Sequence, residues 1–175
     1  KFPITRLYLV ASSKSAGKKI NFLGKECSVE NLEKFDFSKV KIAFFAAGSS
    51  VAEKWALAAA KKTIVIDNSK FFRKDQEIPL IVPEVNSEEL PKFKNKNIIA
   101  NANCSVIPIV VALKPLHDLY DVRRIVASTY QSVSGAGKAG MDELLSQTRE
   151  ILENKKVQSK NFTKQIAFNA IPHID

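Results

Sequence analysis

One strand–helix–strand segment constrains the fold of this chain most strongly. An apolar run of strand length at residues 40–47 leads into Gly48-Ser49-Ser50, and a helical segment follows at residues 51–61. A second short apolar run comes next, at residues 63–67. Strands that alternate with helices indicate an α/β fold with a doubly wound parallel sheet.

The same alternation extends to both sides of this segment. Further strands are expected at residues 7–11, 19–22, 26–29, 78–82 and 97–101, and further helices at residues 86–93 and 106–118. Pro108 is tolerated in the first turn of the later helix, whereas Pro115 is expected to kink that helix or end it early.

The pattern changes beyond residue 120. Residues 121–133 alternate in polarity, which predicts the first strand of a second sheet. The elements expected after it are a glycine loop at 134–138, a helix at 139–152, an exposed and mobile excursion at 154–164 and a strand at 167–171. We therefore predict two domains, residues 1–103 and residues 104–175.

Cys104 is the strongest candidate for a chemical role. It lies where the strand at 97–101 runs into the helix at 106–118, so its thiol is expected at a helix N-terminus. Unpaired N–H groups and the helix dipole favour thiolate there, and thiolate is the nucleophile. An inert buried cysteine is the alternative, but the small polar neighbours of Cys104 suit a partly open pocket better.

Two loops are candidates for binding a nucleotide cofactor. Ser12, Lys14 and Ser15 follow an early strand, and hydroxyl groups with one cation suit a phosphate monoester. A basic residue at such a position accommodates the 2′-phosphate of NADP, whereas NAD calls for an acidic residue. Gly48 and Ser49 form a strand–loop–helix joint, where a doubly wound sheet binds its ligand. An ordinary Ser/Gly-rich loop is the alternative at residues 12–17.

Several segments, in order, resemble the aspartate-β-semialdehyde dehydrogenase family. They are residues 11–18 (ASSKSAGK), 67–73 (DNSKFFR), 101–105 (NANCS) with 111–116 (VALKPL), 129–137 (TYQSVSGAG) and the tail 167–175 (AFNAIPHID). Each segment alone is modestly specific. Together they cover almost the whole chain in the right order, which makes the resemblance specific.

The resemblance implies a fold, a reaction and a set of site residues. The fold is an incomplete Rossmann-like sheet at residues 1–103, which binds NADP, followed by the start of an α+β catalytic and dimerisation domain. The reaction interconverts L-aspartate 4-semialdehyde plus phosphate and L-4-aspartyl phosphate through a thioester. The implied roles are nucleophile for Cys104, phosphate binding for Arg73 and Asn103, substrate contact for Gln131, 2′-phosphate contact for Lys14 and Ser15, and nicotinamide contact for Ser134 and Gly135.

The family also implies a setting. Its members act in the biosynthesis of lysine (through diaminopimelate), methionine and threonine, as homodimers or homotetramers. The chain has only two cysteines, Cys27 and Cys104, which predicts a reduced, cytoplasmic setting. Two family features have no counterpart here: a Gly-rich loop before Leu7 and the acid/base histidine, which neither His117 nor His173 matches. We therefore expect this chain to be an internal piece of a longer enzyme and inactive alone.

Other classes of protein are less consistent with the sequence. The net charge of +9 is compatible with nucleic acid, but the lysines are spread along the chain and no basic-aromatic motif accompanies them. The apolar runs are too short to span a membrane, and the two cysteines and two histidines lack metal-site spacing. A related phosphorylating dehydrogenase, such as N-acetyl-glutamyl-phosphate reductase or a glyceraldehyde-phosphate type, and a non-catalytic binding fragment remain as alternatives.

Overall fold

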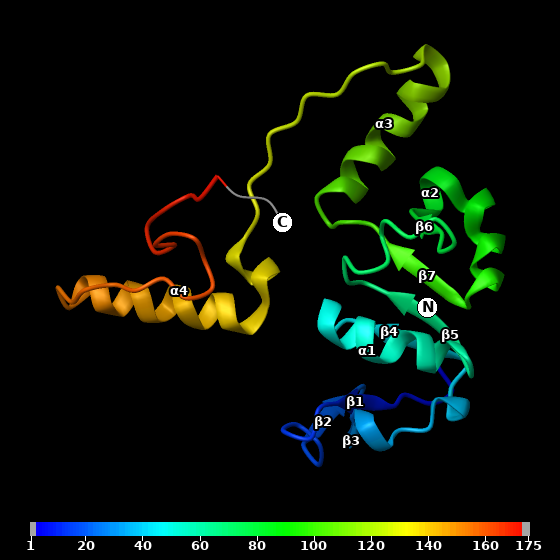
Figure 1. The fold of residues 1–175 in the computed structure, drawn as a ribbon, viewed down its shortest axis with the longest axis horizontal. Coiled ribbons are helices and arrows are strands. Elements are labelled where there is room, and N and C mark those ends of the chain that lie inside the picture. Colours follow the sequence, from blue (N-terminus) through cyan, green and yellow to red (C-terminus); the bar gives the residue numbers. More distant parts are fainter. Residues whose placement is uncertain (1–2, 173–175) are drawn as a thin grey trace. The chain divides into compact units, whose positions relative to one another are not determined.

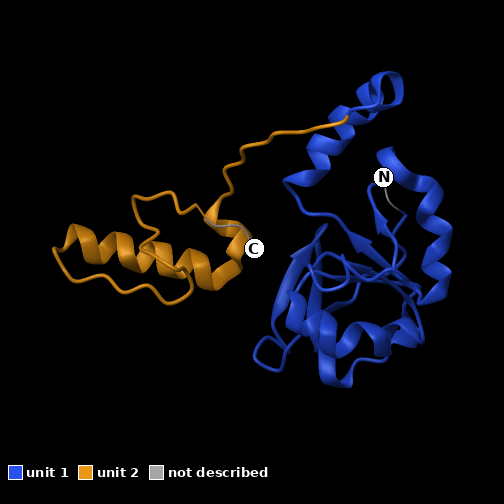
Figure 2. Ribbon diagram, turned by 45° about the horizontal axis from the view of Figure 1, so that its top comes forward, with its two compact units in different colours: residues 1–122 blue, residues 123–175 orange. Residues whose placement is uncertain are grey.

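The computed structural model describes residues 3–172, so His173 and the end of the resembling tail lie outside the described residues. The chain divides into two compact units, residues 1–122 and residues 123–175 (Figure 2). The predicted boundary at 103/104 falls inside the first unit, where a strand passes into a helix, and it stays a prediction.

The larger sheet of the first unit is parallel and has the strand order β4-β5-β7-β6 (Figure 1). Its strands are β4 (Ile42–Phe45), β5 (Ile64–Asp67), β6 (Leu80–Ile81) and β7 (Ile98–Asn101). The parallel sheet expected from the sequence is therefore confirmed. β5 and β7 are buried at alternate positions, whereas β4 lies at the edge and leaves Phe44 67% exposed.

A smaller sheet precedes it in the chain. Its strands β1 (Leu9–Ala11), β2 (Lys19–Phe22) and β3 (Lys25–Asn31) have the order β1-β3-β2. β1 pairs with β3 in parallel, and β2 forms an antiparallel hairpin with β3. Leu23 and Gly24 make the hairpin turn with φ of 50° and 77°, and two such values are typical of the tight turns that match strand twist.

A row of aromatic rings runs from the start of the chain to β4. Tyr8 packs on Phe35, Phe35 on Phe37, and Phe37 on Phe45, with ring centroids 5.6, 5.2 and 6.1 Å apart. Phe37 and Phe45 are buried in the main core. Phe35 directly follows the short 3-10 helix η1 (Leu32–Lys34), and Phe37 is the first residue of the next one, η2 (Phe37–Lys39).

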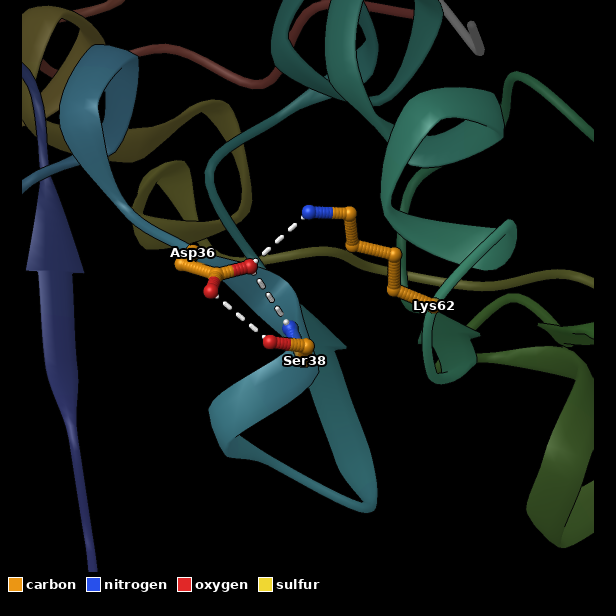
Figure 3. Close-up of polar contacts among 3 residues, drawn as sticks. All are labelled: Asp36, Ser38 and Lys62. Atoms are coloured by element: carbon orange, nitrogen blue, oxygen red, sulfur yellow. Dashed lines mark hydrogen bonds and ion pairs between the residues drawn. The ribbon is translucent and has the colours of Figure 1, made fainter.

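A polar cluster ties this connection to the end of α1 (Ser49–Ala60). The Asp36 carboxylate accepts hydrogen bonds from Lys62 Nζ at 2.9 Å, Ser38 Oγ at 2.7 Å and Ser38 N at 3.1 Å (Figure 3). The Lys62 ammonium first, and then the two Ser38 donors, hold the pKa of Asp36 well below its usual range. The cluster therefore stays charged and intact at neutral pH.

The helix α1 packs on the sheet through alanines. Ala52, Ala56, Ala59 and Ala60 are 0–4% exposed, and their spacing is that of one helical face. Their small side chains allow the helix to approach β5, which it contacts. Ser49 and Ser50 occupy the first turn and make no side-chain cap, since the N-cap position belongs to Gly48.

The later helices of the first unit differ in part from the helices predicted at residues 86–93 and 106–118. The segment after β6 forms α2 (Pro83–Asn86) and a 3-10 helix η3 (Ser87–Asn95). The helix α3 (Val106–Tyr120) continues past Pro115, so the expectation of an early end is wrong. It ends at Asp121, whose φ of 53° is left-handed, as is common where helices stop.

The second unit is helical in its described part. It contains η4 (Val133–Ala136) and α4 (Gly137–Leu152), which confirms the predicted helix. The strands predicted at residues 121–133 and 167–171 are wrong, because the described residues of this unit include no strand to pair with them. Residues 123–132 are irregular and exposed: alternation in polarity does not by itself supply a hydrogen-bonding partner.

Two buried polar side chains of α4 hold the segment after it. Gln147 Oε1 accepts from the N–H groups of Ile166 and Ala167 at 2.9 and 3.2 Å. Glu143 accepts from the N–H groups of Lys160 and Asn161 at 2.9 and 2.6 Å. The excursion expected to be mobile is thus exposed in its side chains but bound to α4 along its backbone.

We expect Ala56→Leu to destabilise the fold by about 1–3 kcal/mol, because the added atoms have no room between α1 and the sheet. Ala58→Leu is the matched control, since Ala58 lies on the exposed face of the same helix. Urea unfolding of both variants measures the difference. Equal stability of the two variants would show that the alanine face is not tightly packed.

Glu143 should make the second unit sensitive to acid. Burial alone would raise the pKa of Glu143, but the N–H groups of Lys160 and Asn161 hold that pKa below its ordinary value. The Glu143 carboxylate therefore stabilises the second unit fully at pH values above the ordinary glutamate pKa of about 4.3. This stabilisation is lost as the pH falls through the lower pKa that Glu143 has in the folded protein.

Hydrogen exchange of the Lys160 and Asn161 amides measures this effect. We expect Glu143→Gln to remove the protection of at least one of the two amides at neutral pH, at a cost of about 1–3 kcal/mol, because an amide supplies one acceptor oxygen where the carboxylate has two. Protection of both amides that survives in Glu143→Gln, or protection that does not change in acid, would contradict this role.

Candidate active site

The candidate site lies where neighbouring parallel strands end. β5 pairs with β7 so that Asp67 lies opposite Ala100, and the carboxyl ends of both strands meet at one edge of the sheet. The segment that follows β5 leads to Arg73, and the segment that follows β7 leads to Cys104. Figure 1 shows β7 leading directly into α3 at this edge.

Cys104 occupies the place that the sequence predicts. It is exposed, it is not in a disulfide, and it directly precedes Ser105, the N-cap of α3. The carbonyl of Asn103 accepts from the N–H groups of Val106 and Ile107 at 3.0 and 3.1 Å, which anchors the start of the helix. Cys104 is therefore not the buried cysteine of the alternative, and its role as nucleophile stays a prediction.

The side-chain amide of Asn103 is hydrogen-bonded through its oxygen. Its Oδ1 accepts a hydrogen bond from Ser105 N at 2.8 Å, next to the thiol. The Nδ2 group, which can only donate, makes no hydrogen bond within the described residues. An amide fixed in this orientation offers N–H groups to an anion beside Cys104.

Arg73 is not a solvated surface arginine. Its side chain is half-buried, Nε donates to the carbonyl of Asn101 at 3.0 Å, and Nη2 donates to the carbonyl of Asn68 at 3.3 Å. These bonds hold the guanidinium against the segment that carries Cys104. Its remaining N–H groups have the fork geometry that binds phosphate.

Two asparagines beside Arg73 were not recognised from the sequence. Asn101 Nδ2 donates to Asn68 Oδ1 at 2.6 Å and joins the segments that follow β5 and β7. The sequence signals for them are their positions at the ends of predicted strands and within two of the segments that resemble the family. Recognising the pair also requires knowing that β5 and β7 are neighbours.

A local turn positions Arg73 along its own segment. The Asp67 carboxylate is fully buried and accepts from Ser69 N at 3.1 Å and Ser69 Oγ at 2.7 Å. Ser69 Oγ accepts in turn from Phe71 N at 3.1 Å, and Phe72 is buried in the core. The chain is therefore held on both sides of the turn before it reaches Arg73.

The predicted cofactor loops also follow strands of the first unit. Ser12 begins a turn closed by its carbonyl and the N–H of Ser15 at 2.9 Å. Lys14 is exposed at this turn, and no described carboxylate pairs with it. Gly48 has a φ of 92°, which favours glycine, and no atom lies within 4 Å of the point where its Cβ would be. The backbone before Ser49 is therefore open to a phosphate, which fits a dinucleotide.

The remaining predicted residues belong to the second unit. Gln131 is exposed, and its side chain lies over Gly135: a Cβ on Gly135 would come within 2.3 Å of Gln131 Nε2. Ser134 N donates to Ser132 Oγ at 3.3 Å in the adjacent turn. The structure thus brings Gln131, Ser134 and Gly135 together, and their roles stay predictions.

The described residues contain no group of three or more His, Cys, Asp or Glu side chains placed to hold a metal ion. Nor does any helix among residues 3–172 have the length and apolar character needed to cross a membrane.

Two family models match this chain. Residues 1–93 match the model described as semialdehyde dehydrogenase, NAD binding domain, and residues 113–175 match the model described as semialdehyde dehydrogenase, dimerisation domain. This chain belongs to the semialdehyde dehydrogenase family. The fold class predicted from the sequence agrees with this membership.

Two curated relatives of this chain are aspartate-semialdehyde dehydrogenases by name. The chain is 53% identical to "Aspartate-semialdehyde dehydrogenase 2" of Vibrio cholerae and 51% identical to "Aspartate-semialdehyde dehydrogenase" of Rickettsia typhi, covering 99% of this chain and 52% of each relative. The chain therefore spans about half the length of the curated relatives it matches. The predicted resemblance to aspartate-β-semialdehyde dehydrogenases is confirmed.

Solved structures agree with this fold. The crystal structure of aspartate semialdehyde dehydrogenase II complexed with ASA from Vibrio cholerae matches with a TM-score of 0.92 and 52% identity, over 99% of this chain and 52% of that one. A Candida albicans aspartate semialdehyde dehydrogenase with NADP matches with a TM-score of 0.53 and 29% identity, over 65% of this chain and 39% of that one.

We expect Cys104 to react with iodoacetamide faster than Cys27. Cys104 is exposed at a helix N-terminus, whereas Cys27 is half-buried in β3, with Sγ 3.9 Å from the carbonyl of Lys25. Mass spectrometry of the two cysteine peptides measures both rates in one sample. Faster labelling of Cys27 would contradict the accessibility that the site requires.

Proposed function

We propose that this family member catalyses the NADP- and phosphate-dependent oxidation of L-aspartate 4-semialdehyde to L-4-aspartyl phosphate, and that biosynthesis uses the reverse direction. The observation that carries the proposal is the meeting of Cys104, Asn103 and Arg73 at one edge of the sheet. A nucleophilic thiol beside an arginine and a fixed amide suits a reaction in which phosphate attacks an acylated cysteine.

The first half of the reaction makes a thioester on Cys104. The Cys104 thiolate adds to the aldehyde carbon and forms a hemithioacetal. Bound NADP+ supplies the hydride acceptor that this step needs. Loss of that hydride, with transfer of the hydroxyl proton to solvent water, leaves a thioester on the sulfur. The exposed thiol at the start of α3 is accessible to a small aldehyde.

The second half transfers the acyl group to phosphate. A phosphate oxygen attacks the thioester carbon, the carbon–sulfur bond breaks, and the Cys104 thiolate leaves. Arg73 holds the phosphate through the N–H groups that its carbonyl contacts do not use, and Asn103 Nδ2 donates to the same anion. Both groups are fixed by hydrogen bonds before phosphate arrives, so little ordering cost remains on binding.

Substrate and cofactor are assigned partly through relatives. The Vibrio cholerae structure is complexed with ASA, and the Candida albicans structure is with NADP. In this chain, exposed Lys14 with Ser15 and Ser12 supports a 2′-phosphate, and the open turn at Gly48 and Ser49 supports the rest of the dinucleotide. In the second unit we assign Gln131 to the substrate and Ser134 and Gly135 to the nicotinamide half.

The setting is proposed on similar grounds. The match to a dimerisation domain supports a homodimer or homotetramer. A free thiol as nucleophile supports a reducing compartment, the cytoplasm. The aspartyl phosphate chemistry proposed above supports a role in lysine (diaminopimelate), methionine and threonine biosynthesis.

The test uses the chain extended to the length of its relatives with the flanking segments of the Vibrio cholerae relative, referred to below as the extended protein. We expect it to reduce NADP+ with aspartate semialdehyde over many turnovers only when phosphate is present. Cys104→Ser should abolish turnover while NADP binding changes little, because an alcohol is a far weaker nucleophile. Turnover that survives in Cys104→Ser would refute the nucleophile assignment.

Arg73→Ala should chiefly impair the use of phosphate. We expect the KM for phosphate to rise about tenfold or more, because a charge-assisted, forked contact is lost. Arg73→Lys should recover only part of this loss, since an ammonium is a point charge without the fork. Unchanged phosphate kinetics in Arg73→Ala would refute its role.

A further inference from the structure

We propose that Asn68 and Asn101 form a positioning pair that fixes the phosphate-binding Arg73 relative to Cys104. This inference rests on the proposed function and adds two residues to its site. Neither asparagine touches the reacting atoms in the reaction outlined above. Both act through Arg73 and through the segment that carries the thiol.

The pair joins the two segments that supply the site. Asn68 directly follows β5, and Asn101 is the last residue of β7. Asn101 Nδ2 donates to Asn68 Oδ1 at 2.6 Å, across 33 residues of sequence. Asn68 is also anchored from its other side, because its N–H donates to the carbonyl of Phe45 at the end of β4 at 2.9 Å.

The Arg73 guanidinium joins the same two asparagines through their main-chain carbonyls. Its Nε donates to the carbonyl of Asn101 and its Nη2 donates to the carbonyl of Asn68, at 3.0 and 3.3 Å. One guanidinium thus binds the main chain of both residues whose side chains bind each other. If the asparagine pair opens, one of the contacts that fix the spacing of the two carbonyls is lost, and with it part of the support for Arg73.

This arrangement matters for one step of the reaction. Phosphate must lie within attack distance of the thioester on Cys104, and misplacement by about 1 Å can cost about a hundredfold in rate. Formation of the thioester itself uses no phosphate. Loss of the pair should therefore slow acyl transfer to phosphate and leave thioester formation nearly intact.

The experiment separates these two halves in the extended protein. A rapid burst of NADPH without phosphate reports thioester formation, and steady turnover with phosphate reports the complete reaction. We expect Asn68→Ala and Asn101→Ala each to lower phosphate-dependent kcat about tenfold or more, with the burst changed less than about threefold. The double variant should be no slower than either single variant, because all three lose the same contact.

Two further variants sharpen the test. Asn68→Asp keeps an oxygen that accepts the Asn101 N–H group, so it should lose much less than Asn68→Ala. Asn21→Ala is the matched control, because Asn21 is an exposed asparagine of β2. The iodoacetamide labelling rate of Cys104 should be unchanged in every variant, which shows by a readout other than activity that the thiol is intact.

Several results would overturn the inference. Equal losses in Asn68→Asp and Asn68→Ala, parallel losses of burst and turnover, additive losses in the double variant, or no loss at all would each refute the positioning role. Absence of a burst in the unsubstituted extended protein would refute the proposed function, and this role would then fall with it.

Discussion

The parallel pairing of β5 with β7 is the interaction on which the site depends. Because Asp67 lies opposite Ala100, the segments that follow the two strands leave the sheet side by side. The buried alanine face of α1 and the buried residues of β5 and β7 hold this pairing from within the core. This pairing brings together two candidate site residues, Arg73 and Cys104, that lie about thirty positions apart in the sequence.

Polar contacts then convert this closeness into a defined geometry. Asp67 and Ser69 shape the turn before Arg73, main-chain carbonyls hold its guanidinium, and Asn103 orients its amide by accepting from Ser105. The Arg73 and Asn103 side chains each use part of their hydrogen-bonding capacity to build the site and leave other N–H groups for a ligand. This division explains how exposed polar residues can be ordered before substrate binds.

Much of this organisation follows from the sequence, and the exceptions have physical reasons. Short apolar runs that end in small polar residues correctly predicted the strands that deliver Gly48, Asn68 and Cys104. Alternation at residues 121–133 wrongly predicted a strand, since polarity does not show whether a partner is present. Gln147 was missed because a glutamine on an amphipathic helix normally faces solvent, and Asn68 with Asn101 was missed because their contact depends on strand order.

In the proposed reaction, Cys104 carries the acyl group that phosphate removes. The most direct test is mass spectrometry of the extended protein after reaction with aspartate semialdehyde and NADP+ without phosphate. We expect an acyl adduct on the peptide containing Cys104, which disappears when phosphate is added. No adduct, an adduct on Cys27, or an adduct on Cys104 that persists with phosphate would contradict it.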